Sequence, residues 1–203
     1  MVEAIVDFYY GLGSRYSYLA STQVAALEAE TGCRVRWRPL SSGDLMAARG
    51  YNPFHGPAVS GQYEWTYRQA DAEAWAEYYG VPYREPVAFR MDPRHLAEAC
   101  IAAGRMDGLI PYSRRLFAAI FVDGRRIDGG VLEEIAAAIA LDPAEFHALR
   151  ADPATVAAHL DTVREAHRRG AFGVPSFFVG DRLFWGNDRL VLLRHHLMTR
   201  REA

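Results

Sequence analysis

The sequence predicts an α/β fold in which a small sheet, built from the two ends of the chain, is interrupted by an all-helical insertion. Runs of β-branched and aromatic residues, which are typical of strands, occur at residues 4–10, 34–40 and 176–185. Between them, from about residue 42 to residue 170, Ala-rich helical patterns are separated by Pro and Gly. An amphipathic helix from Asp188 follows, so the expected order is βαβ, then helices, then ββα.

Size and charge narrow the possible functions. The chain has 203 residues, 50% of them hydrophobic and 24% charged, which suffices for a substantial core. A net charge of -2 without a basic stripe gives no support for nucleic-acid binding. No segment is apolar enough to span a bilayer and residues 1–4 lack a secretory pattern, so we expect a cytoplasmic protein without a membrane partner. Cys33 and Cys100 lie far apart and indicate buried thiols, with neither a disulfide framework nor a metal site.

The first elements form a βαβ unit. Residues 4–10 are β-branched and aromatic and stop at Gly11, which predicts a strand followed by a turn. From Ser14 an apolar stripe with helical spacing continues to Gly32, a typical C-terminal cap, and this predicts one helix. Residues 34–40 alternate polar and apolar side chains and predict a second strand.

The middle of the chain predicts helices. Asp142 and Asp152 each precede a proline, and an acidic N-cap followed by Pro at the first helical position is typical of a helix start. Apolar periodicity predicts helices in four ranges: residues 62–79, 93–103, 131–140 and 154–169.

The last elements restore the strand pattern. Residues 176–179 and 182–185 are separated by Gly180-Asp181, which predicts a β-hairpin before the final helix. A βαβ start and a ββα end around helices are the order of a thioredoxin-type sheet interrupted by a second domain. The predicted organisation is a thioredoxin-like domain in two parts, with a helical insertion domain between them: residues 1–41, 42–170 and 171–203.

The segment Ser14-Arg15-Tyr16-Ser17 occupies the strand-to-helix turn at which thioredoxin-like proteins carry a redox C-x-x-C. Because serines occupy both cysteine positions, dithiol exchange is excluded at this turn. What remains is a hydroxyl group beside the free N–H groups at the positive end of a helix, an arrangement suited to an anion. A serine in front of a helix is also a common N-cap, so Ser14 is either a cap or a ligand-binding hydroxyl.

Two further pairs of residues are candidates for binding. Val174 and Pro175 come directly before the predicted hairpin. In the thioredoxin architecture a cis-proline here faces the catalytic turn, and the main chain of the preceding residue pairs with an extended peptide ligand. A trans proline at the first residue of a strand fits the same sequence. Asn187 and Asp188 lie at the start of the last helix, where capping and ligand binding are both compatible with their side chains.

Short motifs occur in order along nearly the whole chain. They are Asp7-Phe8-Tyr9, Ser14-Arg15-Tyr16-Ser17-Tyr18-Leu19-Ala20, Trp37-Arg38-Pro39, Asn52-Pro53, Gly173-Val174-Pro175-Ser176-Phe177-Phe178-Val179 and Phe184-Trp185-Gly186-Asn187-Asp188-Arg189-Leu190. In these motifs the chain resembles 2-hydroxychromene-2-carboxylate isomerases, which are close relatives of kappa-class glutathione transferases. The resemblance implies a thioredoxin fold with a helical insertion, glutathione as cofactor, a small aromatic substrate and commonly a homodimer.

The resemblance also implies roles for the residues at matching positions. Ser14 matches the serine that contacts the glutathione sulfur and is the expected catalytic residue. The expected cofactor-binding residues are Asn52, Val174, Pro175, Asn187 and Asp188. Asn52 lines the active site, and the backbone of Val174, next to Pro175, pairs with the cysteine of the tripeptide. Asn187 and Asp188 hold its γ-glutamyl end.

Two positions depart from the family pattern. Arg15 stands where a proline usually follows the serine, and Gln62 stands where a basic residue often binds the glycyl carboxylate of glutathione. Arg15 therefore points to an altered substrate pocket, and Gln62 leaves that carboxylate without its usual partner.

The resulting hypothesis is a glutathione-dependent isomerase that acts on 2-hydroxychromene-2-carboxylate, or on a similar aromatic catabolite, by reversible thiolate addition. Ser14 is expected to donate a hydrogen bond to the sulfur and not to act as a covalent nucleophile, because no base stands near it in sequence. Two alternatives remain open. One is a kappa-type glutathione transferase or peroxidase, and the other is a non-catalytic ligand- or partner-binding protein with a thioredoxin fold, which Arg15 motivates.

Overall fold

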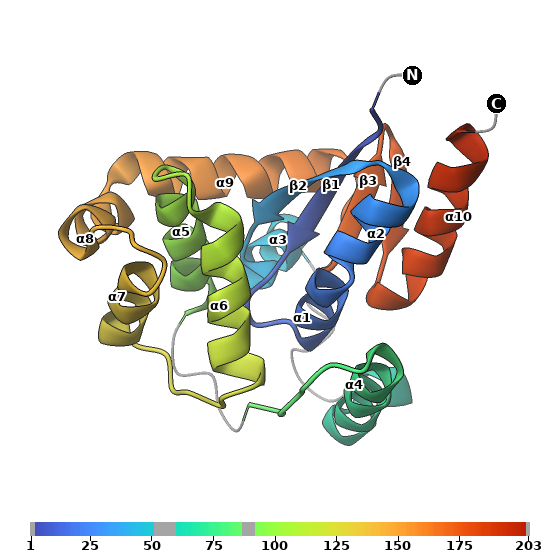
Figure 1. Cartoon of the computed structure of the whole chain (residues 1–203), viewed down its shortest axis with the longest axis horizontal. Coiled ribbons are helices and arrows are strands. Elements are labelled where there is room, and N and C mark those ends of the chain that lie inside the picture. The colour runs from blue at the N-terminus through green and yellow to red at the C-terminus, as the bar shows by residue number, and fades with distance from the viewer. Residues whose placement is uncertain (1–2, 51–59, 87–91, 202–203) are drawn as a thin grey trace.

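The computed structural model of the chain describes residues 3–50, 60–86 and 92–201. The predicted α/β architecture is present: one four-stranded sheet in the order β2-β1-β3-β4 is covered on both faces by helices (Figure 1). No helix within the described ranges combines the length and the apolar character needed to cross a membrane.

Both ends of the chain supply the sheet, as expected. The strands are β1 (Ile5–Tyr10), β2 (Arg34–Pro39), β3 (Ser176–Val179) and β4 (Arg182–Trp185). β1 is parallel to β2 and antiparallel to β3, and β3 and β4 form the predicted hairpin. The ring of Phe8 in β1 stacks on that of Phe177 in β3, with centroids 4.6 Å apart and an interplanar angle of 6°. This cross-strand pair joins the first and the last part of the chain.

The helices lie between and after these strands. Two short 3-10 helices are η1 (Gly61–Tyr63) and η2 (Asn187–Arg189). The α-helices are α1 (Arg15–Thr22), α2 (Val24–Thr31), α3 (Ser42–Ala48), α4 (Trp65–Tyr79), α5 (Pro93–Gly104), α6 (Leu109–Phe121), α7 (Gly129–Ala137), α8 (Pro143–Ala151), α9 (Pro153–Arg168) and α10 (Leu190–Arg201). The predicted caps Asp142 and Asp152 are confirmed, because each side chain accepts a hydrogen bond from an N–H group in the first turn of α8 or α9.

Alternating side chains of β1 face two packed layers. Phe8 and Tyr10 belong to a large buried cluster that includes side chains of α1, α2, α5, α6 and α10. Tyr9 points to the opposite face, where it packs with Leu45 of α3 and Val163 of α9. Because the large cluster also contains Phe146 of α8, the inserted helices and the sheet share a core. The domain boundaries at residues 41 and 170 stay a prediction.

Residues 14–32 form two helices instead of the single predicted one. Gln23 separates α1 from α2. Just before it, the hydroxyl groups of Ser21 and Thr22 each donate a hydrogen bond of 2.6 Å to a main-chain carbonyl of the preceding turn. Such side-chain bonds compete with the helical N–H groups and bend a helix, which explains the interruption.

Other boundaries also differ from the prediction. The range 62–79 begins as the 3-10 turn η1, so α4 starts at Trp65. α3 and α6 were not predicted. α3 has only seven residues, too few for a clear apolar stripe. α6 follows Gly108, which has no capping side chain, and it carries Pro111 in its first turn, so it lacks the start signal of α8 and α9.

Candidate active site

The turn between β1 and α1 presents Ser14. Its Oγ accepts a hydrogen bond from the Ser17 N–H at 3.2 Å, so Ser14 is the N-cap of α1. Because the hydroxyl oxygen is the acceptor in this bond, its proton remains available for donation to a ligand. The N–H groups of Arg15 and Tyr16, in the first turn of the helix, have no intrahelical acceptor. The capping role and the ligand-binding role are therefore compatible at one hydroxyl group.

Val174 and Pro175 lie opposite this turn, and the peptide bond between them is cis. A Cβ atom placed on Gly11, at the end of β1, would lie 3.2 Å from Cγ2 of Val174, so the two segments approach closely. Within the described ranges, the N–H and C=O groups of Val174 have no main-chain hydrogen-bond partner. Both groups are thus available to an extended ligand.

Asn187 and Asp188 lie in η2, which packs against α1. Asn187 is only 4% exposed, and its Nδ2 has no hydrogen-bond partner among the described residues. An unpaired buried donor is energetically unfavourable, so this amide fits the carbonyl or carboxylate oxygen of a ligand. The Gly186 N–H donates to the carbonyl oxygen of Pro175 at 3.0 Å and holds η2 beside the cis peptide.

Gly186 determines where the Asp188 side chain lies. Its φ of +107° lies in the region that favours glycine, and a Cβ atom there would come within 2.3 Å of Oδ1 of Asp188. The Asp188 carboxylate is partly exposed and lies 3.4 Å from Nε of Arg189. A side chain at position 186 would therefore displace this carboxylate.

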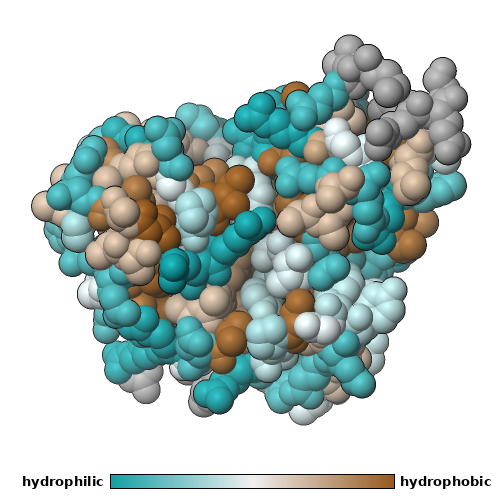
Figure 2. Space-filling view, in the orientation of Figure 1, coloured by the Kyte–Doolittle hydropathy of each residue, from teal (hydrophilic) through white to brown (hydrophobic). Residues whose placement is uncertain are grey.

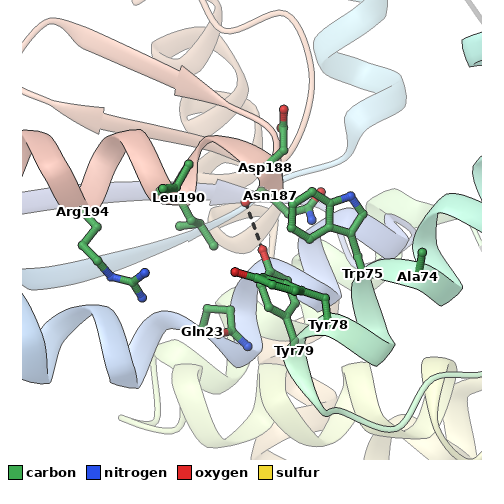
Figure 3. A pocket seen from close by; sticks show the side chains of 10 residues that line it. Gln23, Ala74, Trp75, Tyr78, Tyr79, Asn187, Asp188, Leu190 and Arg194 are labelled. Atoms are coloured by element: carbon green, nitrogen blue, oxygen red, sulfur yellow. Dashed lines mark hydrogen bonds between the residues drawn. The ribbon is translucent and has the colours of Figure 1, made fainter.

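A pocket of about 690 Å³ opens beside η2 (Figure 3). Figure 3 shows aromatic side chains projecting from α4 toward η2 and α10, whereas the Asp188 side chain points away from the two tyrosines. The lining residues are Gln23, Ala74, Trp75, Tyr78, Tyr79, Asn187, Asp188, Leu190, Val191 and Arg194. Ser14 and Val174 are not among them, so the pocket does not contain the β1–α1 turn; it reaches α1 only at Gln23, the C-cap of that helix.

Sequence reasoning did not identify this pocket. The Tyr79 hydroxyl donates to the main-chain oxygen of Asn187 at 3.2 Å, although the two residues are 108 positions apart. The surface over α4 shows both pale and teal atoms in Figure 2, as expected where aromatic and charged side chains reach solvent together. Tyr67 and Tyr78 are among the exposed aromatic residues of this helix. The only sequence signal was the aromatic content of residues 62–79, which core packing explains equally well.

Arg15, the first residue of α1, is buried although it is charged, with 6% of its surface exposed. Its Nη2 donates to Oε1 of Glu85 at 2.6 Å, and the Tyr83 hydroxyl donates to the other oxygen of the same carboxylate. The Cζ atom of Arg15 lies 4.3 Å from the ring centroid of Trp65. Arg15, which departs from the family pattern, therefore forms a buried ion pair with Glu85 next to Ser14 in the chain.

The remaining candidates contribute less to the described site. Asn52 lies outside the described residues, so its expected contact stays a prediction. Gln62 is exposed in η1. Cys33 and Cys100 are buried, and burial raises the pKa of both thiols, that of Cys100 to about 12. No cluster of three or more metal-ligating side chains occurs in the part of the chain that the structure covers. The two cysteines are thus poor sources of a thiolate at neutral pH.

Known sequences are similar to this chain over nearly its whole length. A profile of the DSBA-like thioredoxin domain matches residues 5–198. A 2-hydroxychromene-2-carboxylate isomerase from Sphingobium xenophagum is 31% identical over 196 residues, which cover 95% of this chain and 97% of that protein. A protein of the same name from Pseudomonas sp. (strain C18) is 28% identical, over 94% of this chain and 89% of its own.

Solved structures are similar as well. A 2-hydroxychromene-2-carboxylate isomerase superposes with a TM-score of 0.83 at 27% identity, covering 97% of this chain and 95% of that chain. The cytosolic disulfide reductase DsbM from Pseudomonas aeruginosa, solved with GSH, superposes with a TM-score of 0.65 at 24% identity, covering 95% and 98%. The thioredoxin-like fold predicted from the order of the elements is confirmed.

Proposed function

The chain belongs to the DSBA-like thioredoxin domain family and, within it, to the 2-hydroxychromene-2-carboxylate isomerases, and on this basis we propose that it is a glutathione-dependent isomerase of an aromatic catabolite. The names of its relatives support the isomerase activity and the substrate class. The observation that carries the glutathione dependence is Ser14, whose hydroxyl caps α1 and still has a proton to donate, in the turn whose Gly11 lies close to Val174.

The residues around this turn fit glutathione. A bound tripeptide needs main-chain partners along its backbone and polar partners for its charged ends. The main chain of Val174 and the unpaired Nδ2 of Asn187 are such partners. When bound, glutathione supplies a thiolate that adds reversibly to an unsaturated carbon of the substrate and so permits rotation about the former double bond.

Ser14 and the start of α1 stabilise a negative charge on the bound sulfur. A free thiol has a pKa of about 8.5, so only a few per cent is ionised at neutral pH. A hydrogen bond from Ser14 to a charged acceptor contributes about 1.5–3 kcal/mol, and the helix N-terminus contributes roughly 0.3–1 kcal/mol. At about 1.4 kcal/mol per pKa unit, these contributions together lower the pKa of the bound thiol by about 1–3 units, from which the cost of desolvation is subtracted. A shift of this size makes the thiolate the major form at neutral pH.

The other residues hold the tripeptide. The N–H and C=O groups of Val174, fixed beside Pro175, pair with its cysteine. The Asp188 carboxylate attracts the γ-glutamyl ammonium group, and Nδ2 of Asn187 donates to the neighbouring carboxylate. Asn52 is expected to line the same site from the segment after α3. Their work is binding and orientation, whereas Ser14 acts on the sulfur itself.

Disulfide exchange is a poor fit for this chain, although several proteins of the same fold are disulfide oxidoreductases. Ser14 and Ser17 occupy both positions of the redox motif, and Cys33 and Cys100 are buried elsewhere. The chain therefore offers no dithiol at the start of α1. This difference favours chemistry in which the sulfur comes from a bound molecule.

The test is turnover of a panel of hydroxybenzylidenepyruvates and their cyclic hemiketals, with and without reduced glutathione. We expect isomerisation only with glutathione present, and we expect the total free thiol to be unchanged after many turnovers. Consumption of thiol together with a conjugate would instead identify a kappa-type transferase. Binding of glutathione without turnover of any member of the panel would favour the non-catalytic alternative.

The proposal includes a cytoplasmic homodimer. The cytoplasm supplies reduced glutathione, and the resemblance to the isomerase family implies two copies. Sedimentation equilibrium of the purified chain measures the second point directly, because a single species with the mass of one chain contradicts it.

A further inference from the structure

Arg15 has one hydrogen-bonding group that its surroundings do not satisfy. Its Nη1 is inaccessible to solvent and has no hydrogen-bond partner among the described residues. The guanidinium carries five N–H donors in a fixed plane, and a buried donor without an acceptor is energetically unfavourable. Glu85 compensates the charge through Nη2 but leaves Nη1 unpaired.

The plane of this guanidinium is held on two sides. Glu85, only 10% exposed, is fixed in turn by the hydroxyl of Tyr83. The ring of Trp65 lies against the Cζ atom of Arg15 and is itself 57% exposed, so the ring extends from the buried ion pair to the surface. Because the guanidinium is already held in one orientation, it loses little further conformational freedom when a planar acceptor binds.

A second guanidinium group lies near the first. Arg68 packs over the ring of Tyr16 at 5.6 Å, and Tyr16 donates to Asp71 at 2.7 Å. Burial, with a smaller contribution from the charge of Arg15, lowers the pKa of Arg68. The start of α1 and the first turns of α4 thus bring a second cation near Arg15, the residue that follows Ser14.

We propose that Arg15 recognises a carboxylate of a molecule bound at the β1–α1 turn through Nη1, and that Glu85 and Trp65 position its guanidinium for this contact. The inference rests on the proposed function, because its two expected ligands, glutathione and the aromatic acid, each carry a carboxylate. One source is the glycyl carboxylate of glutathione, for which Gln62 provides no cation. The other is the carboxylate of the aromatic acid. Arg15 is then a specificity-determining residue.

Calorimetric binding, which needs no turnover, separates the two sources. The probes are glutathione against its glycyl monoethyl ester, and o-hydroxybenzylidenepyruvate against its methyl ester in the absence of glutathione. The variant is Arg15→Met with Glu85→Gln, since removing both members of a buried pair avoids an uncompensated charge. The matched control is Arg125→Met with Glu134→Gln, which removes an exposed arginine–glutamate pair between α7 and the segment before it.

If the glycyl carboxylate is the ligand, the Arg15 variant loses roughly 10- to 100-fold in affinity for glutathione and little for the monoethyl ester, as expected for one hydrogen bond to a charged group. If the aromatic acid is the ligand, the same loss appears for the pyruvate and not for its methyl ester. Either pattern supports the inference, provided that the control variant binds all four probes as the wild type does.

Equal losses for acids and esters would show that Arg15 only packs α1 against residues 83–85, and affinities within twofold of the wild type for both acids would show that it has no role in binding. Either result overturns the inference. Arg15→Lys keeps the charge but replaces the planar guanidinium with a single ammonium group. Compared with the Arg15→Met, Glu85→Gln variant, it should restore part of the preference for the acid over the ester. The proposed function fails separately, if the wild type binds the aromatic acid in an Arg15-dependent manner but neither binds glutathione nor responds to it.

Discussion

Ser14 has a counterpart in the same chain that caps a helix without any expected chemistry. Ser41 precedes α3, and its Oγ accepts a hydrogen bond from the Asp44 N–H at 3.2 Å, the same length as the bond from the Ser17 N–H to Ser14. Ser41 is buried, whereas Ser14 is half-buried and belongs to the turn in which Gly11 closely approaches Val174. A comparison of variants at Ser14 and Ser41 therefore distinguishes the effect of losing a helix cap from the effect of losing a ligand-binding hydroxyl.

Ser14→Ala and Ser41→Ala should therefore have similar effects on stability and different effects on activity. Each removes one cap and should lower the free energy of unfolding by about 0.5–2 kcal/mol. Only Ser14→Ala removes the donor to the sulfur, so we expect it to lower the isomerisation rate about 10- to 100-fold. The thiolate absorbance of bound glutathione should fall in parallel. Full activity in Ser14→Ala would remove Ser14 from the mechanism.

The residues of the site differ in how far they were predictable. Ser14, Val174 and Asn187 belong to short motifs whose positions next to a strand or helix can be predicted locally, so the sequence identified them as candidates. The partner of Arg15 was not predictable, since Glu85 lies 70 positions away in a segment without a regular pattern. Long-range side-chain pairs of this kind depend on the tertiary packing of α1 against the segment that follows α4.

Among the elements, α3, α5 and α9 are joined by a polar cluster that is buried at His159 and reaches the surface at Arg94. His159 of α9 is fully buried, and its Nε2 accepts a hydrogen bond from the Ser41 N–H at 3.1 Å. Asp44 of α3 accepts two hydrogen bonds from Arg94 of α5, at 2.5 and 2.9 Å, and these lower the pKa of Asp44. Burial lowers the pKa of His159, so the imidazole is neutral in the folded chain.

Protonation of His159 should make stability depend on pH. In the unfolded chain a histidine has a pKa of about 6.5, so below that pH the unfolded state takes up a proton that the folded state does not. The contribution is therefore present above about pH 6.5 and is lost as the pH falls, by up to about 1.4 kcal/mol per pH unit. Denaturant unfolding between pH 7.5 and pH 5 measures this slope.

His159→Gln keeps an acceptor for the Ser41 N–H and should flatten that slope. The matched control is His147→Gln, since His147 is an exposed histidine of α8 that pairs with Glu133 at 2.7 Å. An unchanged slope in His159→Gln would mean that other groups account for the acid sensitivity.

The connection between β4 and α10 contains Gly186, which determines where the Asp188 side chain lies. Gly186→Ala should displace Asp188, because the new Cβ atom would meet Oδ1 of that residue, and it should weaken glutathione binding several-fold. Gly180→Ala is the control: Gly180 also has a positive φ, of +58°, but has no neighbour within 4 Å of a new Cβ atom. Both variants should lose about 1 kcal/mol or more of stability from backbone strain. Equal glutathione affinity in the two variants would contradict the role of Asp188.

Elements with strong local signals were predictable. β1, the β3–β4 hairpin and the Asp-capped helices α8 and α9 combine periodicity with a clear start or stop. The split between α1 and α2 was not, because it depends on whether the hydroxyl groups of Ser21 and Thr22 turn toward main-chain carbonyls. α6 lacks a capping side chain, and its apolar face is stabilised by packing against α5 and, through Phe117, against Tyr10 of β1.

In the whole molecule, the proposed ligand connects residues from the two ends of the chain. A ligand that binds only the folded state stabilises it by about 2.7 kcal/mol at a concentration of 100 times its Kd. For a chain of this size we expect glutathione at that concentration to raise the unfolding temperature by roughly 5–10 °C. Cysteinylglycine, which lacks the γ-glutamyl group, should give a smaller rise in differential scanning calorimetry. Equal shifts from both thiols would argue against Asn187 and Asp188 as binding residues.

The order of the sheet has a consequence for biosynthesis. β1 leaves the ribosome before the other three strands and pairs early with β2, but its other edge is completed only by β3, which is translated after α9. Throughout the synthesis of α3 to α9 the nascent chain therefore carries an open edge with aromatic residues, a feature that invites self-association. We expect a holding chaperone to bind this intermediate until the hairpin emerges and completes the sheet.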